Sequence, residues 1–138
     1  MTSRALIPEI DVEDITVSVN FYVDILGFEI EFSRPEEKFT SLILGNACIM
    51  LQEAVGPGRR FRTAPLEHPY GRGINIQIEL IGIDKLHQRL KEYGCTLVLE
   101  PEVKTYRTGD TVITLKQLVV ADPDGYLLRL QEILSEEE

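Results

Sequence analysis

The strongest constraint on how this chain can fold is an order of strands and helix that occurs twice. Each half of the sequence contains one strand, one amphipathic helix and three further strands. Because one helix covers only one face of a sheet, two such units predict an α+β protein of two βαβββ modules. The predicted elements are a strand at 6–12, a helix at 15–26, strands at 28–32, 39–44 and 47–53, a strand at 74–80, a helix at 83–93, and strands at 96–99, 112–120 and 126–131.

The two halves also match residue by residue at their ends. The segment 47–53 (ACIMLQE) aligns with 126–132 (YLLRLQE) at an offset of 79 residues (132 − 53), and three of the seven positions are identical. Asp14 precedes the first helical stripe as an N-cap, and Gly27 and Gly94 follow the two stripes as helix terminators. These signals place the same elements at the same points of both halves.

The domain organisation follows from the repeat. We expect one domain over residues 1–138, with βαβββ repeats at about 6–53 and 74–132 and a linker at about 54–73. The linker is rich in Gly, Pro and Arg, and a connection longer than about 12–15 residues without its own structure is often functional, for example as a lid. The stretch 101–110 is predicted to be irregular and to form another wall. The acidic end of the chain is expected to fray in solvent.

The composition excludes some classes of function. The net charge of −9, from 14 basic and 23 acidic residues, repels phosphate backbones and argues against nucleic acid as a partner. No apolar run approaches the ~20 residues of a membrane span. The start, Met1 to Arg4, lacks the apolar core of a signal peptide, so the cytoplasm is the expected location. Cys48 and Cys95 have no metal-binding spacing. The acidic excess is compatible with a cationic small-molecule ligand, but it also serves solubility.

Alternation along four strands predicts a mixed surface on the face away from the helices. Such a face either meets water or becomes a pocket when curved modules close around it. The residues on this surface are Glu9, Asp11, Met50, Gln52, Asn75, Gln77, Arg129 and Gln131.

Two segments resemble the vicinal oxygen chelate superfamily, which includes glyoxalase I, extradiol dioxygenases, fosfomycin-resistance enzymes and bleomycin-resistance proteins. Val12-Glu13-Asp14 leading to Asn20-Phe21-Tyr22-Val23-Asp24-Ile25-Leu26-Gly27-Phe28 is similar to the first helix of the family and its exit. Asp122-Pro123-Asp124-Gly125-Tyr126 is similar to the turn before the final strand. With the βαβββ repeat, the resemblance covers about residues 6–133 and implies curved mixed sheets that form a cleft.

The resemblance also indicates where enzymes of this superfamily would hold a divalent metal. The four ligand positions fall at Ile7, Met50, Asn75 and Arg129, and Met50 and Arg129 are partners in the 79-residue repeat. Ile7 has no donor atom, Met50 offers a soft thioether, and Asn75 offers a weak neutral oxygen. Arg129 carries a permanent positive charge and no acceptor. We therefore expect no metal, no cofactor and no catalytic residues of the usual kind.

The departure from the metal pattern is similar to the bleomycin-resistance branch, whose members bind and sequester a bulky cationic drug. The resemblance implies an antibiotic-resistance function, a homodimer with ligand pockets between subunits, and arm exchange associated with Pro8. The chain lacks tryptophan, so Phe61, Tyr70 or Tyr106 would stack on a ligand. The predicted ligand-binding residues are Glu9, Asp11, Met50, Gln52, Asn75, Gln77, Tyr106 and Arg129.

Two alternatives to sequestration stay open at this point. One is a metal-dependent lyase or dioxygenase with ligands shifted in register, such as Glu9, Gln52 or Glu53, and Glu79. The other is an interaction or regulatory domain with a vestigial pocket. His68 in the linker and His87 on the second helix are interpreted as surface residues, because a general base also needs an orienting partner and a pocket. The arginines at 59, 60, 62 and 72 are interpreted as solvated loop charges or an anion site.

Overall fold

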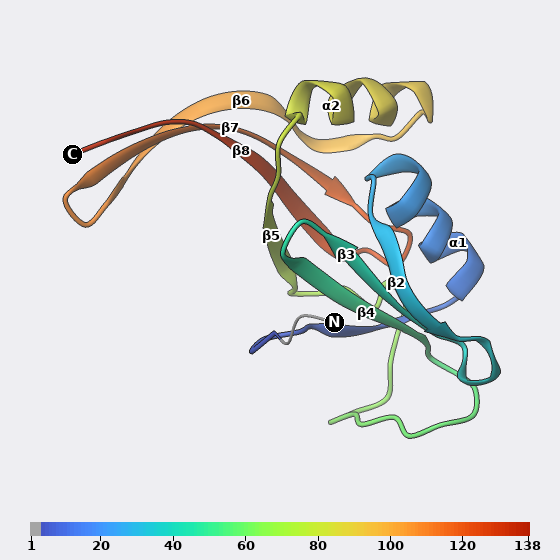
Figure 1. Ribbon diagram of the computed structural model, residues 1–138. Coiled ribbons are helices and arrows are strands. Elements are labelled where there is room, and N and C mark those ends of the chain that lie inside the picture. The colour runs from blue at the N-terminus through green and yellow to red at the C-terminus, as the bar shows by residue number, and fades with distance from the viewer. Residues whose placement is uncertain (1–3) are drawn as a thin grey trace.

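The computed structural model describes residues 4–138 and contains two four-stranded sheets, each with one helical segment packed on it (Figure 1). Residues 1–3, which carry most of the start that was compared with a signal peptide, lie outside this range. Sheet A and its helices consist of β1 (Glu9–Val12), α1 (Ile15–Asn20), η1 (Phe21–Ile25), β2 (Glu29–Arg34), η2 (Pro35–Glu37), β3 (Phe39–Leu44) and β4 (Ala47–Glu53). Sheet B and its helix consist of β5 (Asn75–Glu79), α2 (Ile83–Glu92), β6 (Leu97–Thr108), β7 (Thr111–Ala121) and β8 (Leu127–Glu137).

The two sheets have the same topology. Their strand orders are β1-β4-β3-β2 and β5-β8-β7-β6, so the first strand of each module lies beside its last strand. That pair is parallel in both sheets, and the other neighbours are antiparallel. The parallel registers pair Glu9 with Met50 and Gln77 with Arg129. The predicted α+β fold of two βαβββ modules is confirmed.

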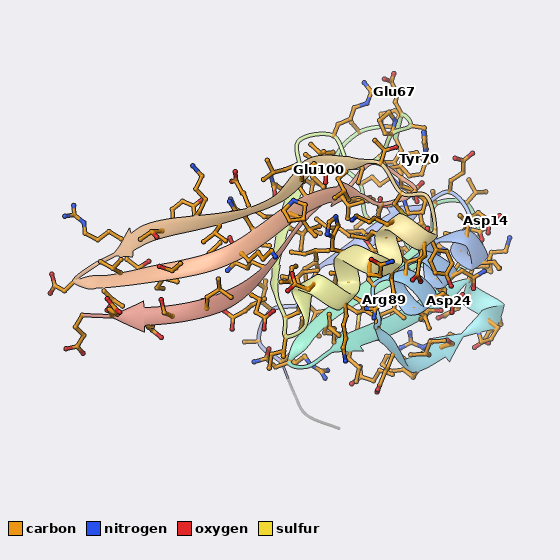
Figure 2. All side chains as sticks on the ribbon, turned by 90° about the horizontal axis from the view of Figure 1, so that it is seen from above. Asp14, Asp24, Glu67, Tyr70, Arg89 and Glu100 are labelled. Atoms are coloured by element: carbon orange, nitrogen blue, oxygen red, sulfur yellow. The ribbon has the colours of Figure 1, made fainter. Side chains whose placement is uncertain are left out.

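The hydrophobic core lies between the helices and the helix-facing sides of the two sheets. It includes Tyr22 and Leu26 from the first helical segment and Leu86 and Leu90 from α2, all at most 2% exposed. Both modules contribute to one continuous cluster. The two modules are also linked by Arg89, whose Nε donates from α2 to the carbonyl of Ile25 (2.8 Å). Figure 2 shows the Arg89 side chain extending from α2 toward the first module. Within residues 4–138, no helix combines the length and the apolar character needed to cross a membrane.

The structure differs most clearly from the sequence prediction in three features. The stretch 101–110 is not irregular, because nearly all of it belongs to β6, which pairs along its length with β7. The acidic end does not fray, because β8 continues to Glu137 and stays paired with β7. The sequence did not predict the full length of β6, because charged and threonine side chains follow one another there and both faces of the strand are exposed. The first helix also changes to π geometry, with the amide of Leu26 bonded to the carbonyl of Phe21 (3.2 Å).

The extra length of β6, β7 and β8 forms an arm that projects away from both helices (Figure 1). Strand β5 pairs with β8 only over residues 127–131, so the remainder of β8 has β7 as its single partner. The arm therefore presents a long three-stranded surface beyond the body of the protein.

A pair of equivalent glutamates supports the start of each helix. Glu53 Oε2 accepts from the amide of Ile15 at the start of α1 (3.1 Å). Glu132 Oε1 accepts from the amides of Gly82 and Ile83 at the start of α2 (3.2 and 3.0 Å). These glutamates are partners in the 79-residue repeat, so the repeat preserves a contact between the last strand and the helix. A helix N-terminus favours such a negative group because its first amides have no partner within the helix.

The turn before β8 joins the two modules through buried hydrogen bonds. Asp122 accepts from the Tyr22 hydroxyl (2.7 Å) with Oδ2, and from the amides of Asp124 and Tyr126 (2.9 and 3.0 Å) with Oδ1. The Tyr126 hydroxyl in turn donates to the carbonyl of Asp11 (2.8 Å). Burial raises the pKa of Asp122, and burial also raises the pKa of Tyr22, with Asp122 adding to the effect. Backbone and side-chain atoms of both modules thus converge on one turn.

The linker at residues 54–73 contains no helix or strand, yet its last part packs closely on this turn. The amide of Gly71 donates to the carbonyl of Asp124 (3.0 Å). A Cβ at Gly71 would lie 2.3 Å from the amide nitrogen of Tyr126, and a Cβ at Gly125 would lie 2.5 Å from the Cβ of Pro69. Only glycine allows this approach, so the linker is fixed to the second module here.

We predict that Glu132→Ala lowers the free energy of unfolding by about 1–2 kcal/mol. Helix α2 has no side-chain cap of its own at Gly82, so losing Glu132 leaves its first amides without an acceptor. Chemical denaturation measures the change. Glu136→Ala, at an exposed position near the end of β8, is the control and should change stability by less than about 0.5 kcal/mol. An equal loss in both variants would contradict the capping role.

We also predict a pH-dependent difference between the wild type and Asp122→Asn. Because the pKa of Asp122 is raised in the folded chain, the folded state holds its proton at pH values where the unfolded state has released it. The free energy of unfolding contributed by this carboxyl therefore falls as the pH rises from about 4 through the raised pKa. Denaturation of both proteins across this range should show the wild type losing stability relative to the variant. A constant or growing wild-type advantage would exclude this linkage.

Candidate functional site

Sheet B has an open hollow of about 270 Å³ on the face away from α2. Strands β5, β6, β7 and β8 all contribute side chains to it. It is lined by Gln77, Tyr106, Thr108, Ile113, Leu115, Gln117, Arg129, Gln131 and Ile133. The polar groups therefore lie among branched apolar side chains, which is the usual make-up of a small-molecule site.

Arg129 is the one formal charge among the residues that line this hollow. Its Nη2 donates to the side-chain carbonyl of Gln77, its register partner on β5. Its Nε is buried and has no hydrogen-bond partner within residues 4–138. An unsatisfied buried donor is costly, so this nitrogen is a candidate contact for a ligand acceptor.

The glutamine on β7 organises the other side of the hollow. Gln117 is 4% exposed, and its Nε2 donates to Glu102 Oε1 and to the Tyr106 hydroxyl oxygen (both 3.0 Å). The Tyr106 hydroxyl hydrogen is not used by this bond, so it is available to a ligand. Gln131 is also buried, at 6% exposed, and faces the same space from β8.

Sheet A has a smaller hollow of about 140 Å³, and much of the face around it is filled by the chain's own charges. Asp11 Oδ1 accepts from Arg62 Nη2 of the linker (2.9 Å) and from Gln52 Nε2 (3.2 Å). Arg4 donates to Glu31 (2.9 Å), and this bond is the main cause that holds the pKa of Glu31 below its usual range. The hollow is lined by Glu9, Arg34, Glu37, Phe39, Gln52, Gly58, Arg59 and Arg60.

The structure divides the predicted ligand-binding residues between the two sheets. Gln77, Tyr106 and Arg129 come together in the hollow of sheet B. Glu9 and Gln52 line the hollow of sheet A, and Asp11 lies beside Gln52. Half-buried Met50 and exposed Asn75 line neither of these two hollows.

Sequence reasoning missed the contribution of β7. Ile113, Leu115 and Gln117 alternate along this strand and face the hollow together with Thr108 and Ile133. The same period-two argument that was applied to four strands would have found them, because Gln117 is the polar member of this alternating set. The surface predicted from the sequence did not include β7, which lies between β6 and β8 in sheet B.

A larger hollow of about 380 Å³ lies between α1 and the β2–β3 hairpin. Its lining comes from Ile15, Thr16, Val19, Asn20, Ile30, Ser33, Pro35, Lys38, Phe39 and Thr40. Neither of the two buried, partnerless side-chain nitrogens of residues 4–138 belongs to this lining. The hollow of sheet B is smaller, but a residue with a buried, partnerless donor, Arg129, belongs to its lining.

Comparison with known proteins decides the family. The sequence profile described as Glyoxalase/Bleomycin resistance protein/Dioxygenase superfamily matches residues 8–130. The chain belongs to this superfamily.

Within the glyoxalase/bleomycin resistance superfamily, the chain is similar to proteins named for drug resistance. It is 32% identical to the bleomycin resistance protein of Geobacillus stearothermophilus over 128 residues, which covers 88% of this chain and 91% of the relative. The same figures hold for a bleomycin resistance protein of Staphylococcus aureus. In structure the chain is similar to TioX from Micromonospora sp. ML1, with a TM-score of 0.74, 17% identity and coverage of 96% and 100% of the two chains. A virulence protein from Salmonella typhimurium gives a TM-score of 0.71 at 20% identity, covering 96% and 98%.

The residues at the metal positions of this superfamily do not fit a divalent ion. The registers place Met50 beside Glu9 on sheet A and Arg129 beside Gln77 on sheet B, where Arg129 already donates to that glutamine. A guanidinium supplies no lone pair, and it repels a cation.

The shifted ligands of the enzyme alternative do not gather either. Glu53 is committed to the start of α1 and to Lys38. Across residues 4–138, one group of at least three His, Cys, Asp or Glu side chains has its ligand atoms close together. Glu9, Glu53 and Glu79 do not belong to this group.

We predict that Arg129→Met leaves the free energy of unfolding unchanged or raises it by up to about 1 kcal/mol. The substitution removes a partly buried charge and its unsatisfied Nε, while keeping most of the aliphatic packing. Chemical denaturation of the two proteins gives the comparison. A loss above about 2 kcal/mol would show that Arg129 serves the fold and is not held for a ligand.

Proposed function

We propose that this protein binds and sequesters a small molecule in the hollow of sheet B, in the manner of the bleomycin-resistance proteins and without a metal at the centre. The observation that carries this proposal is Arg129, a cationic side chain that lines the hollow and whose buried Nε has no partner in the described chain. A buried donor without a partner calls for an explanation, and an acceptor group on a bound ligand supplies one.

The lining of the hollow supports binding over catalysis. It contains no histidine, cysteine, aspartate or glutamate, so it lacks the usual general bases and activated nucleophiles. The 32% identity to bleomycin resistance proteins across nearly the whole chain points to the same type of activity. We propose that the protein acts in the cytoplasm, where it would meet an incoming ligand before its target does.

The charge of the hollow argues for a ligand with an acceptor or anionic group at Arg129. Arg129 is its single charged lining residue, and it would repel a cation placed in the same space. A cationic ligand of the bleomycin type would have to place its positive groups elsewhere, for example against Glu9. Around Glu9, however, Arg34, Arg59 and Arg60 line the same hollow. A ligand with a carboxylate or carbonyl directed at Arg129 therefore fits the lining better.

A homodimer would complete the site. The hollow is open, and sheet B reaches beyond the body of the protein through its long arm (Figure 1). We propose that the concave face of sheet A from a second copy covers this hollow, as the family resemblance implies, and that Glu9 and Gln52 approach the ligand from that side.

The decisive experiment is calorimetry with bleomycin and with a panel of aromatic carboxylic acids. A ligand group that accepts from Arg129 makes a charge-assisted bond, so Arg129→Gln should weaken binding by about 10- to 100-fold. Arg107→Gln is the matched control, because Arg107 is exposed on the same strand as Tyr106 and points to the other face. Its affinity should equal that of the wild type.

The same titrations separate the competing functions. Equal affinities of the wild type and Arg129→Gln for every bound ligand would remove this hollow from the function. Stoichiometric metal bound among the central strands in protein purified without chelators would favour the enzyme. Failure of the whole panel to bind to an intact dimer would favour an interaction domain.

A further inference from the structure

Three side chains that commonly bind metals gather at a point outside both hollows. Glu13 lies between β1 and α1, His68 lies in the linker, and Asp124 lies in the turn before β8. His68 Nε2 is 3.3 Å from Glu13 Oε2 and 3.5 Å from Asp124 Oδ1. The ligand atoms of all three residues lie within 4.8 Å of one another. Segments more than 50 residues apart therefore meet here.

The two nitrogen–oxygen separations fit ligand atoms that share one ion. A hydrogen bond from N–H to oxygen spans about 2.7–3.2 Å, and both separations are longer. In a tetrahedral site with bonds of about 2.1 Å to nitrogen and oxygen, neighbouring ligand atoms are about 3.4 Å apart. Small rotations of the exposed Glu13 side chain would complete this geometry.

Asp124 is held rigidly in the orientation that such a site needs. Its side chain is 2% exposed. Oδ1 accepts from the amide of Glu13 (3.0 Å), and Oδ2 accepts from the hydroxyl of the fully buried Ser18 (3.3 Å). Hydrogen bonds of this kind fix the direction of a ligating carboxylate and strengthen its binding to a metal.

The linker delivers His68 to this carboxylate through close backbone packing. Pro69 lies against Gly125, and the amide of Gly71 donates to the carbonyl of Asp124 (3.0 Å). Arg72 Nη2 donates to the carbonyl of His68 (3.0 Å). Figure 2 shows Glu67 and Tyr70, which flank the His68–Pro69 pair, on the linker at one edge of the molecule. The backbone on both sides of His68 is therefore held by contacts, and these contacts direct the imidazole to the site.

We propose that Glu13, His68 and Asp124 bind a divalent transition-metal ion, with Zn²⁺ and Co²⁺ as the fitting class. One imidazole nitrogen and two carboxylate oxygens are ligands of this class, and the two negative charges balance the ion. Water fills the remaining position, because Glu13 and His68 face solvent. The ion clips the linker to the turn that joins the modules, so this site is structural and separate from the proposed ligand hollow.

The test is titration of tag-free protein with Co²⁺, followed by visible absorption, and with Zn²⁺, followed by calorimetry. The wild type should bind one equivalent with the intense visible bands of a tetrahedral site. His68→Ala and Glu13→Gln should each lose at least tenfold in affinity. His87→Ala is the matched control, because His87 lies on α2 with its Nε2 3.8 Å from Glu100 and does not belong to the cluster, so the affinity of this variant should be unchanged.

A second measurement tests whether the ion holds the linker to the turn before β8. Trypsin cleaves at the linker arginines, and Zn²⁺ should slow this cleavage in the wild type and in His87→Ala but not in His68→Ala. Glu13→Gln, at an exposed side chain, keeps the test valid if His68→Ala folds poorly. No binding by the wild type would overturn the proposal. Equal binding by the wild type and Glu13→Gln, or loss of binding only in His87→Ala, would overturn it as well.

Discussion

The arrangement of the two modules depends on the buried hydrogen bonds of the turn before β8. Asp122 binds a tyrosine from the first helix and two amides of its own turn, while Asp124 binds the start of that helix. Burial raises the pKa of Asp122, so the turn carries an electrostatic cost that its three donors offset in part. The same turn receives the linker at Gly71, so it also positions the adjoining segment that brings His68 to Asp124.

The two modules share the contacts that support their backbones, but the side chains on their concave faces differ. Glu53 and Glu132 are equivalent in the repeat, and both hold the start of a helix. Met50 and Arg129 are equally equivalent, yet one is a neutral thioether beside Glu9 and the other is a cation in an open hollow. Contacts that support the backbone are shared, whereas side chains that face the concave side differ, because only the former are needed by both copies of the fold.

The helices, the order of elements along the chain, and the places of Gln77 and Arg129 in the candidate site could be predicted because they rest on local periodicity. The helix-facing alternation of β5 and β8 assigned Gln77 and Arg129 to the opposite face, and the structure places both in one hollow. The continuation of β6 and β8 could not be predicted, because strands with two exposed faces show no alternation of apolar residues. Asp11 was assigned to the concave face, but its carboxylate is occupied by Arg62, a contact that spans 51 residues.

By itself, the sequence determined the two modules, their helix ends and the residue types at the positions that the resemblance assigns to metal ligands, because these depend on neighbours along the chain and on residue type. Tertiary structure alone decided which polar groups are satisfied and which remain available. On sheet A the carboxylate of Asp11 accepts from Gln52 and from Arg62, while Arg129 Nε on sheet B is buried without a partner in the described chain. Tertiary structure also brought His68 to Asp124, because a linker without regular structure has no periodicity that reports where its side chains will end.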